Sequence, residues 1–130
     1  MSYVDGFVIA VPSANREAFV EHARLFDTML IEEGALRVVE CWGDDVPHGK
    51  HTDFHGAVKA TKDETVCFSW VEWPDKATRD EAWGKIMEDE SLRPQGEMPF
   101  VGKRMFWGGF DKIVDTAQQQ ATESEAPITA

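Results

Sequence analysis

Cysteine is scarce in this chain of 130 residues: only Cys41 and Cys67 occur, and they do not form a CxxC pair. Each lies inside an apolar run, a pattern that predicts two small buried thiols in a reducing compartment. A disulfide between them is the alternative, provided that their strands are neighbours.

Positive charge is also in short supply, because thirteen Lys and Arg face twenty-four Asp and Glu, for a formal net charge of -11 at pH 7. Phosphate backbones and anionic lipids are repelled by such a surface, which argues against nucleic acid and membranes as partners. No run of about eighteen apolar residues occurs, and no basic segment precedes an apolar one near the start. We therefore expect no signal peptide and no membrane span, and a cytoplasmic location.

Several patterns of known chemistry are missing. The chain has no Ser-His-Asp order, no Gly-rich phosphate loop and no dinucleotide fingerprint. These absences argue against phosphoryl transfer and Rossmann-type hydride transfer, and no cofactor is indicated. What is present, 42% hydrophobic and 28% charged residues, is typical of one compact globular domain.

Apolar patterning predicts a strand at residues 3–11 that Pro12 ends, because proline lacks a backbone donor. Ser13 is placed to cap a helix at 14–33, and Gly34 to end it in a left-handed conformation. The later elements are a strand at 35–43, a loop at 44–53, a hairpin of 54–60 with 65–73, a helix at 76–88 and a strand at 103–114. In the last strand, Gly108 and Gly109 indicate a bulge or a close backbone approach.

The order of these elements predicts an α+β fold, a ferredoxin-like βαββαβ antiparallel sheet with two helices on one face. We expect one domain over residues 1–114. Residues 115–130 contain no aromatic and only one large aliphatic residue. Burial therefore cannot offset their ordering entropy, and we expect a disordered tail.

Alternate residues of a strand point to opposite faces of the sheet, so each predicted strand contributes two sets of side chains, called phases here. We assign the phase with the smaller side chains to the face that the helices cover, and the phase with the bulkier side chains to the opposite face. That opposite phase comprises Tyr3, Asp5, Phe7, Ile9, Leu36, Val38, Glu40, Trp42, Val66, Phe68, Trp70, Glu72, Lys103, Met105 and Trp107. Rings of this size left in water mark an interface, so we expect a second copy to cover them, burying about 1,600 Å² or more in a homodimer. Two such sheets enclose a dimeric α/β barrel.

Several segments carry a resemblance to a known family: YVDGF at 3–7, ALRVVECW at 35–42, TDF at 52–54, FSWVEWP at 68–74, MPF at 98–100, GKRM at 102–105 and GGF at 108–110. Over roughly residues 1–115 the chain resembles the bacterial YbaA-like family of unknown function. The resemblance implies membership of the dimeric α/β-barrel superfamily and no particular activity. That superfamily includes cofactor-free monooxygenases, lactone isomerases and haem enzymes, which share the fold alone.

Three carboxylates of the bulky phase, Asp5, Glu40 and Glu72, are candidate catalytic residues. Desolvation beside indole rings raises a carboxyl pKa and suits it to proton transfer. The alternative is scaffolding, with the carboxylates satisfied by Lys103 and neighbouring polar groups. Candidate ligand-binding residues are Tyr3, Phe7, Trp42, Trp70, Trp107 and Lys103.

Histidines are clustered once. In an extended chain His51, Asp53 and His55 project to the same side, which makes them weak candidates for a metal site. The alternative is a solvated loop in which Asp53 accepts hydrogen bonds from nearby backbone amides. Analogy with the haem enzymes of the superfamily would make His22 a haem ligand. We interpret it instead as a histidine at the edge of the apolar stripe of the predicted first helix.

The leading hypothesis is a cytoplasmic homodimer that binds a small, largely apolar molecule, without a cofactor, in a cavity between subunits or between sheet and helices. One alternative is a cofactor-free monooxygenase or isomerase in which Glu40 or Glu72 carries a proton. The other is a purely structural dimer. A cavity within the range of about 300–1,000 Å³ that ligand sites occupy distinguishes the first two from the third.

Overall fold

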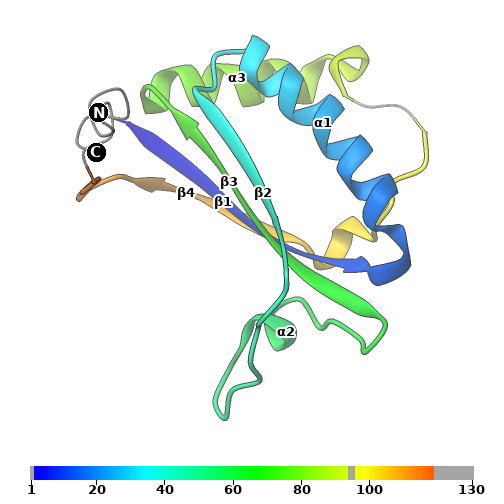
Figure 1. Cartoon of the computed structure of the whole chain (residues 1–130). Coiled ribbons are helices and arrows are strands. Elements are labelled where there is room, and N and C mark those ends of the chain that lie inside the picture. The colour runs from blue at the N-terminus through cyan, green and yellow to red at the C-terminus, as the bar shows by residue number, and fades with distance from the viewer. Residues whose placement is uncertain (1, 94–95, 119–130) are drawn as a thin grey trace, which may run out of the picture.

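The core of the molecule is a four-stranded antiparallel sheet, seen in a computed structural model that describes residues 2–93 and 96–118. Its strands are β1 (Tyr3–Pro12), β2 (Arg37–Trp42), β3 (Glu64–Trp73) and β4 (Phe106–Asp111), arranged in the order β2-β3-β1-β4 (Figure 1). The long strands β1 and β3 are central, and β2 and β4 form the edges. The prediction of an antiparallel α+β fold is therefore confirmed.

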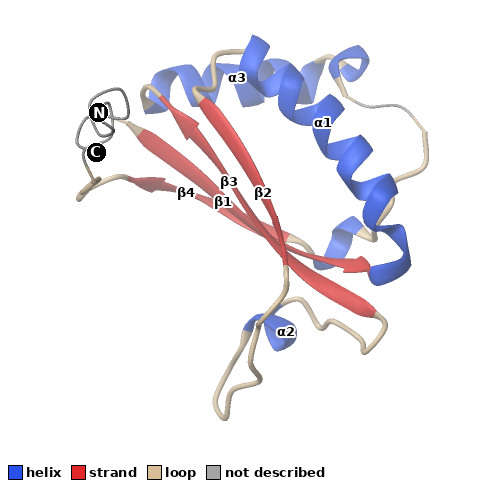
Figure 2. Ribbon diagram, viewed as in Figure 1, coloured by secondary structure: helices blue, strands red, loops and turns tan. Residues whose placement is uncertain are grey.

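Two long helices, α1 (Arg16–Glu32) and α3 (Lys76–Glu88), cross the same side of this sheet (Figure 2). The bounds of α3 coincide with the predicted ones, because the Asp75 carboxylate accepts a 2.7 Å hydrogen bond from the Thr78 amide and caps the helix. Short 3₁₀ helices occupy Ser13–Asn15, Glu90–Leu92 and Gly102–Arg104.

Of the two predicted ends of the first helix, the C-terminal one is confirmed and the N-terminal one is wrong. Gly34 does follow α1 with φ 115°, a backbone angle that favours glycine. The predicted Ser13 cap is wrong, since Ser13 starts the 3₁₀ helix and its hydroxyl lies 2.7 Å from that of Thr65 instead.

The predicted strand at 54–60 is also wrong, and a single helical turn, α2 (Phe54–Ala57), stands in its place. The Asp53 carboxylate accepts hydrogen bonds from the amides of Gly56 (2.6 Å) and Gly49 (3.0 Å), which starts the turn. Val58 follows it and is buried against Val8, Ala10 and Val66. This segment therefore covers one end of the sheet on the side away from α1 and α3 (Figure 1).

The strand register corrects the predicted faces. Residues paired directly across antiparallel strands share a face, and Asp5 pairs with Val71, which pairs with Val38. Val71 and Val38 pack with Leu30 of α1 and Ile86 of α3. The face toward the helices therefore carries most of the residues that we assigned to the other side: Tyr3, Asp5, Phe7, Ile9, Val38, Glu40, Trp42 and Trp107.

Only β3 follows the predicted phase, with Val66, Phe68, Trp70 and Glu72 directed away from the helices. The error has a physical cause: we expected small side chains beneath close-packed helices. Here large rings fill much of the space between the helices and the sheet, and the small residues Gly6 and Gly108 lie on the other side.

That other side, called the open face below, consists of Val4, Val39, Phe68, Trp70, Phe106 and Phe110 around Gly6 and Gly108. Phe110 is 61% exposed and Phe106 47%. An apolar sheet surface thus remains uncovered in a single chain, as predicted, although only Phe68 and Trp70 of its residues were predicted to lie there.

Both cysteines are free thiols. Their strands β2 and β3 are neighbours, but Cys41 pairs with Phe68 and Cys67 with Trp42, so the two thiols lie on opposite faces. Cys67 is buried as predicted, whereas Cys41 is exposed on the open face. None of the helices in the described part of the chain has the length and apolar character needed to cross a bilayer. Of the predicted tail, residues 119–130 lie outside the described residues.

Candidate ligand-binding cavity

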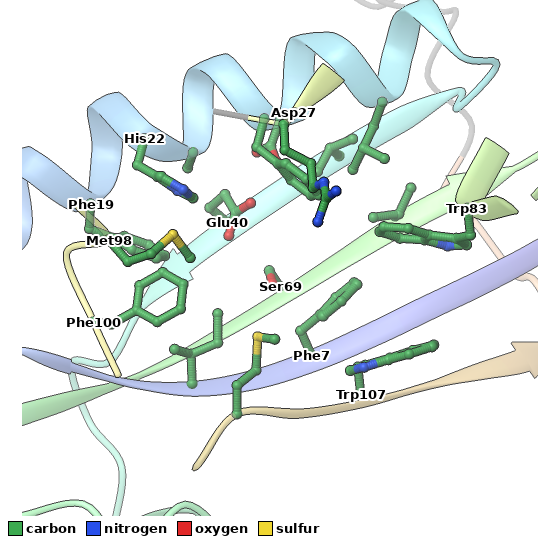
Figure 3. A pocket seen from close by; sticks show the side chains of 18 of the residues that line it. Phe7, Phe19, His22, Asp27, Glu40, Ser69, Trp83, Met98, Phe100 and Trp107 are labelled. Atoms are coloured by element: carbon green, nitrogen blue, oxygen red, sulfur yellow. The ribbon is translucent and has the colours of Figure 1, made fainter. Parts of the chain in front are cut away.

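An open cavity of about 710 Å³ lies between α1 and the helix-facing side of the sheet (Figure 3). Phe19, His22 and Asp27 reach into it from α1, and Trp83 from α3. Met98 and Phe100, from the segment before β4, close the end near Phe19. The volume falls within the range typical of small-molecule sites.

The floor of the cavity is one row of side chains across all four strands. Trp107 pairs with Phe7, Phe7 with Ser69, and Ser69 with Glu40, so the row runs from β4 to β2 (Figure 3). Its chemistry changes from aromatic at β4 to acidic at β2. A ligand lying along this row therefore meets an apolar end and a polar end.

The apolar end is a cluster of three rings. Phe7, Trp83 and Trp107 have centroids 6.2–6.3 Å apart, and the Trp107 ring stacks on the other two. Such contacts suit a flat apolar group better than a charged one.

The polar end is a pair of carboxyl groups. Asp27 comes from α1 and Glu40 from β2, and both side chains enter the space between these elements (Figure 3). Burial, together with a hydrogen bond to the Glu40 carboxyl and its negative charge, raises the pKa of Asp27 to about 9. At neutral pH Asp27 therefore keeps its proton.

His22 lies beside this pair on α1. Its ring stacks with Phe26 and meets the edge of Phe100, and burial lowers its pKa, so the imidazole is neutral at pH 7. The His22 Nε2 atom is buried, and no residue in the described ranges offers it a hydrogen bond. A buried nitrogen without a partner in a cavity wall is a position that a ligand can satisfy.

A second hollow, of about 690 Å³, runs along the outer side of α1 beside the edge strand β2. The two hollows share Phe19, Ala23, Val38, Asp27 and Glu40 as lining residues. The carboxyl pair therefore stands between the cavity and a second opening to solvent.

Asp5, the first of the predicted catalytic carboxylates, has a different setting. It is fully buried and accepts hydrogen bonds from Arg79 and from the indole nitrogens of Trp73 and Trp83, both at 2.9 Å. The Arg79 guanidinium also lies over the rings of Tyr3 and Trp107. Asp5 thus fixes the Trp83 ring of the cavity wall from behind.

The other predicted site residues are scattered. Glu72 lies on the open face, where the Trp70 indole donates a 2.9 Å hydrogen bond to it. Trp42 packs against Phe19 beyond the floor row. Lys103 is exposed in the 3₁₀ helix before β4. The structure therefore brings Phe7, Glu40 and Trp107 together and leaves Asp5, Glu72 and Trp70 elsewhere.

The histidine-rich loop is organised around Asp53. As the alternative interpretation of this loop predicted, Asp53 accepts hydrogen bonds from the Gly56 and Gly49 amides. These bonds hold the pKa of Asp53 below its usual value. His55 stacks on His48 and bonds to the Val46 carbonyl, while His51 is exposed. Within residues 2–93 and 96–118, no group of three or more His, Cys, Asp or Glu side chains is arranged to hold a metal ion.

Asp27 was missed in the sequence analysis, although a signal was present. It lies four residues after Ala23 and three before Leu30, inside the apolar stripe of α1. An acidic residue in the buried stripe of a helix is costly unless it has a partner or a function. Met98 and Phe100 had no comparable signal, because hydrophobic periodicity does not predict the path of an irregular segment.

Comparison with known proteins agrees with this fold. The fold is similar to that in a crystal structure of a dimeric ferredoxin-like protein from an uncultured marine organism, with a TM-score of 0.52 and 7% identity over 89% of this chain and 100% of that one. At this identity the likeness extends to the fold alone.

Closer relatives are uncharacterised. The chain is 53% identical over 116 residues to the uncharacterised protein YbaA of Escherichia coli K12, which covers 88% of this chain and 99% of the relative. The same identity and coverage apply to YbaA of Shigella flexneri. Residues 2–102 match the model of a family described as "Protein of unknown function (DUF1428)". With that match and those relatives, the chain belongs to the DUF1428 family, of which no function is established.

Proposed function

We propose that this protein binds a small, largely apolar molecule in the cavity between α1 and the sheet. The observation that carries the proposal is the cavity itself: about 710 Å³, aromatic at the Trp107 end and acidic at the Glu40 end. A purely structural domain has no reason to keep such a space, because filling it with side chains stabilises the fold.

The proposal includes a homodimer that uses the open face. Phe68, Phe106 and Phe110 expose large apolar surfaces there, and a second copy is a self-complementary cover for them. The dimeric description of the marine ferredoxin-like protein supports this arrangement. Two free thiols and the acidic composition support a reducing, cytoplasmic setting.

Proton transfer without a cofactor is a second candidate function, favoured by the carboxyl pair in the wall. Of the predicted catalytic residues, Glu40 borders the cavity, and Asp27 joins it there. Asp5 and Glu72 take no part in this candidate function, because their contacts are with Arg79 and Trp70.

Titration calorimetry with 2-naphthol, a two-ring probe, tests the binding function. Val38→Phe adds a ring inside the cavity and is expected to weaken binding about tenfold or more. Leu25→Phe is the matched control, since Leu25 is 62% exposed on α1 and the probe should bind it as it binds the parent. Equal affinity of the two variants would show that the probe binds elsewhere.

Native mass spectrometry of protein purified without added ligand complements this titration. It reports the stoichiometry and any retained small molecule in one measurement. A monomer at every concentration would contradict the dimer. A failure of 2-naphthol and of any retained molecule to bind would contradict the binding function.

A further inference from the structure

The carboxyl pair has three properties that together go beyond binding. Asp27 and Glu40 come from elements that face each other, they border the cavity, and Asp27 keeps its proton at neutral pH. Among residues 2–93 and 96–118, no Lys or Arg forms with either carboxyl an ion pair of the kind that holds Asp5. A carboxylate and a carboxylic acid side by side can accept one proton and donate another in the same event.

The surroundings fit this role. The other polar and titratable groups that line the cavity are His22 from α1, Ser69 from β3, and Glu90 and Arg93 from the segment after α3. His22 is neutral at pH 7, so it offers a hydrogen bond without adding charge. The second hollow reaches the pair from the β2 edge, which gives solvent protons a path that does not cross the ligand.

We infer that Asp27 and Glu40 form an acid–base pair that moves a proton to and from the carbon next to a carbonyl group, on a small ketone whose apolar part lies against Phe7 and Trp107. This inference rests on the proposed function, because it needs a ligand in the cavity. The ligand class follows from the two ends of the floor row: a flat apolar body for the rings and a neutral carbonyl for the carboxylic acid.

The step balances without any other reactant. The Glu40 carboxylate takes the proton from the carbon, and the electron pair of the C–H bond forms a C=C bond. The carbonyl π pair takes the proton of Asp27, which leaves an enol, a protonated Glu40 and an ionised Asp27. If the proton on Glu40 is replaced by a solvent deuteron first, return to the same carbon gives exchange, and return to a conjugated carbon gives an isomer. In both cases Glu40 gives up its proton or deuteron to carbon and Asp27 takes back the enol proton, which restores the pair.

Deuterium exchange tests the inference directly. The probe is 2-tetralone in D₂O, with 2-indanone as a second ketone, and proton NMR follows loss of the signals next to the carbonyl. The native protein is expected to accelerate exchange, and Glu40→Gln and Asp27→Asn to slow it about hundredfold. Glu21→Gln, an exposed change on α1, is the matched control and should exchange like the parent.

Three further measurements separate catalysis from structure. Circular dichroism checks that each variant is folded. Acetate added to Glu40→Ala is expected to restore exchange, which a structural role would not produce. The exchange rate should fall as pH rises toward about 9, because Asp27 then loses the proton that it donates to the carbonyl.

Calorimetry with the same ketones separates the two proposals. Binding by the native protein without accelerated exchange would overturn the inference and leave the binding function standing. No binding would overturn the inference and also count against the binding function. Undiminished exchange in both Glu40→Gln and Asp27→Asn would overturn the inference alone.

Discussion

The Arg79 guanidinium donates hydrogen bonds to the buried Asp5 carboxylate from Nε at 3.1 Å and Nη2 at 2.7 Å, which ties α3 to β1. The Trp73 and Trp83 indoles donate to the same carboxylate. One small acidic side chain thereby holds a strand, a helix and the Trp83 wall of the cavity in fixed relation.

Asp5→Asn is expected to lower the free energy of unfolding by about 3–5 kcal/mol, because it leaves Arg79 without its buried counter-charge. Urea denaturation measures the change. Asp80→Asn is the control: Asp80 also bonds to Arg79 but is 46% exposed, so its loss should change the free energy of unfolding far less. An equal decrease in the free energy of unfolding of the two variants would show that the buried Asp5–Arg79 pair contributes no more than the exposed one.

Gly109→Ala is expected to destabilise the protein by about 1–3 kcal/mol. A Cβ at this position would lie 2.6 Å from Arg79 Nη2 and 2.7 Å from Tyr3 Oη, and Arg79 cannot move without leaving Asp5. In a double-mutant cycle, the effects of Gly109→Ala and Asp5→Asn should not add.

Gly84→Ala provides the comparison for Gly109, since a Cβ there meets no atom within 4 Å. This change within α3 should be neutral or stabilise by up to about 1 kcal/mol, because alanine favours helix. A similar destabilisation by both alanines would contradict the steric explanation.

Phe110→Asp is expected to dissociate the proposed homodimer while leaving the fold intact. A charge in the centre of an apolar interface should cost about 2 kcal/mol or more, which is about thirtyfold in the dissociation constant. Sedimentation equilibrium measures it. Leu25→Asp on α1 is the control, because Leu25 is 62% exposed and Phe110 61%. If both variants associate like the parent, the open face is not the interface.

Asp27 should make the folded state less stable as pH rises. Its pKa is raised by burial and by Glu40, so the folded protein holds this proton more tightly than the unfolded chain does. The resulting stabilisation is complete below about pH 4 and is lost as pH rises toward about 9.

Asp27→Asn should reduce this loss, and urea midpoints of both proteins at about pH 5, 7 and 9 measure the difference. Glu40, His22, Glu90 and Arg93 are present in both proteins, so the difference between the curves isolates Asp27. Parallel curves would mean that Asp27 ionises normally.

Local sequence signals located most of the regular structure. The bounds of α3 followed from Asp75 and the periodicity after it, and β1 and β3 from runs rich in β-branched and aromatic residues. The segment at 54–60 failed because its composition is compatible with a strand, whereas Asp53 bonds to the Gly56 amide and starts a helical turn. Such a local hydrogen bond competes with propensity over short stretches.

The faces of the sheet were harder to predict than its strands. Alternation divides each strand into two phases, but the register between strands decides which phases share a side. We matched phases by bulk, and the pairing of Asp5 with Val71 shows that bulk was the wrong criterion. We therefore predicted Glu40 and Trp107 as site residues from an incorrect assignment of the faces, and we missed Asp27.

Trp83 and Trp107 form part of the cavity wall, next to the space where a ligand would lie. Indole emission responds to nearby aromatic groups and to changes in polarity, so occupancy can be followed in the unlabelled protein. A library of natural metabolites can be screened by tryptophan fluorescence in this way, because the protein itself contains the fluorophores.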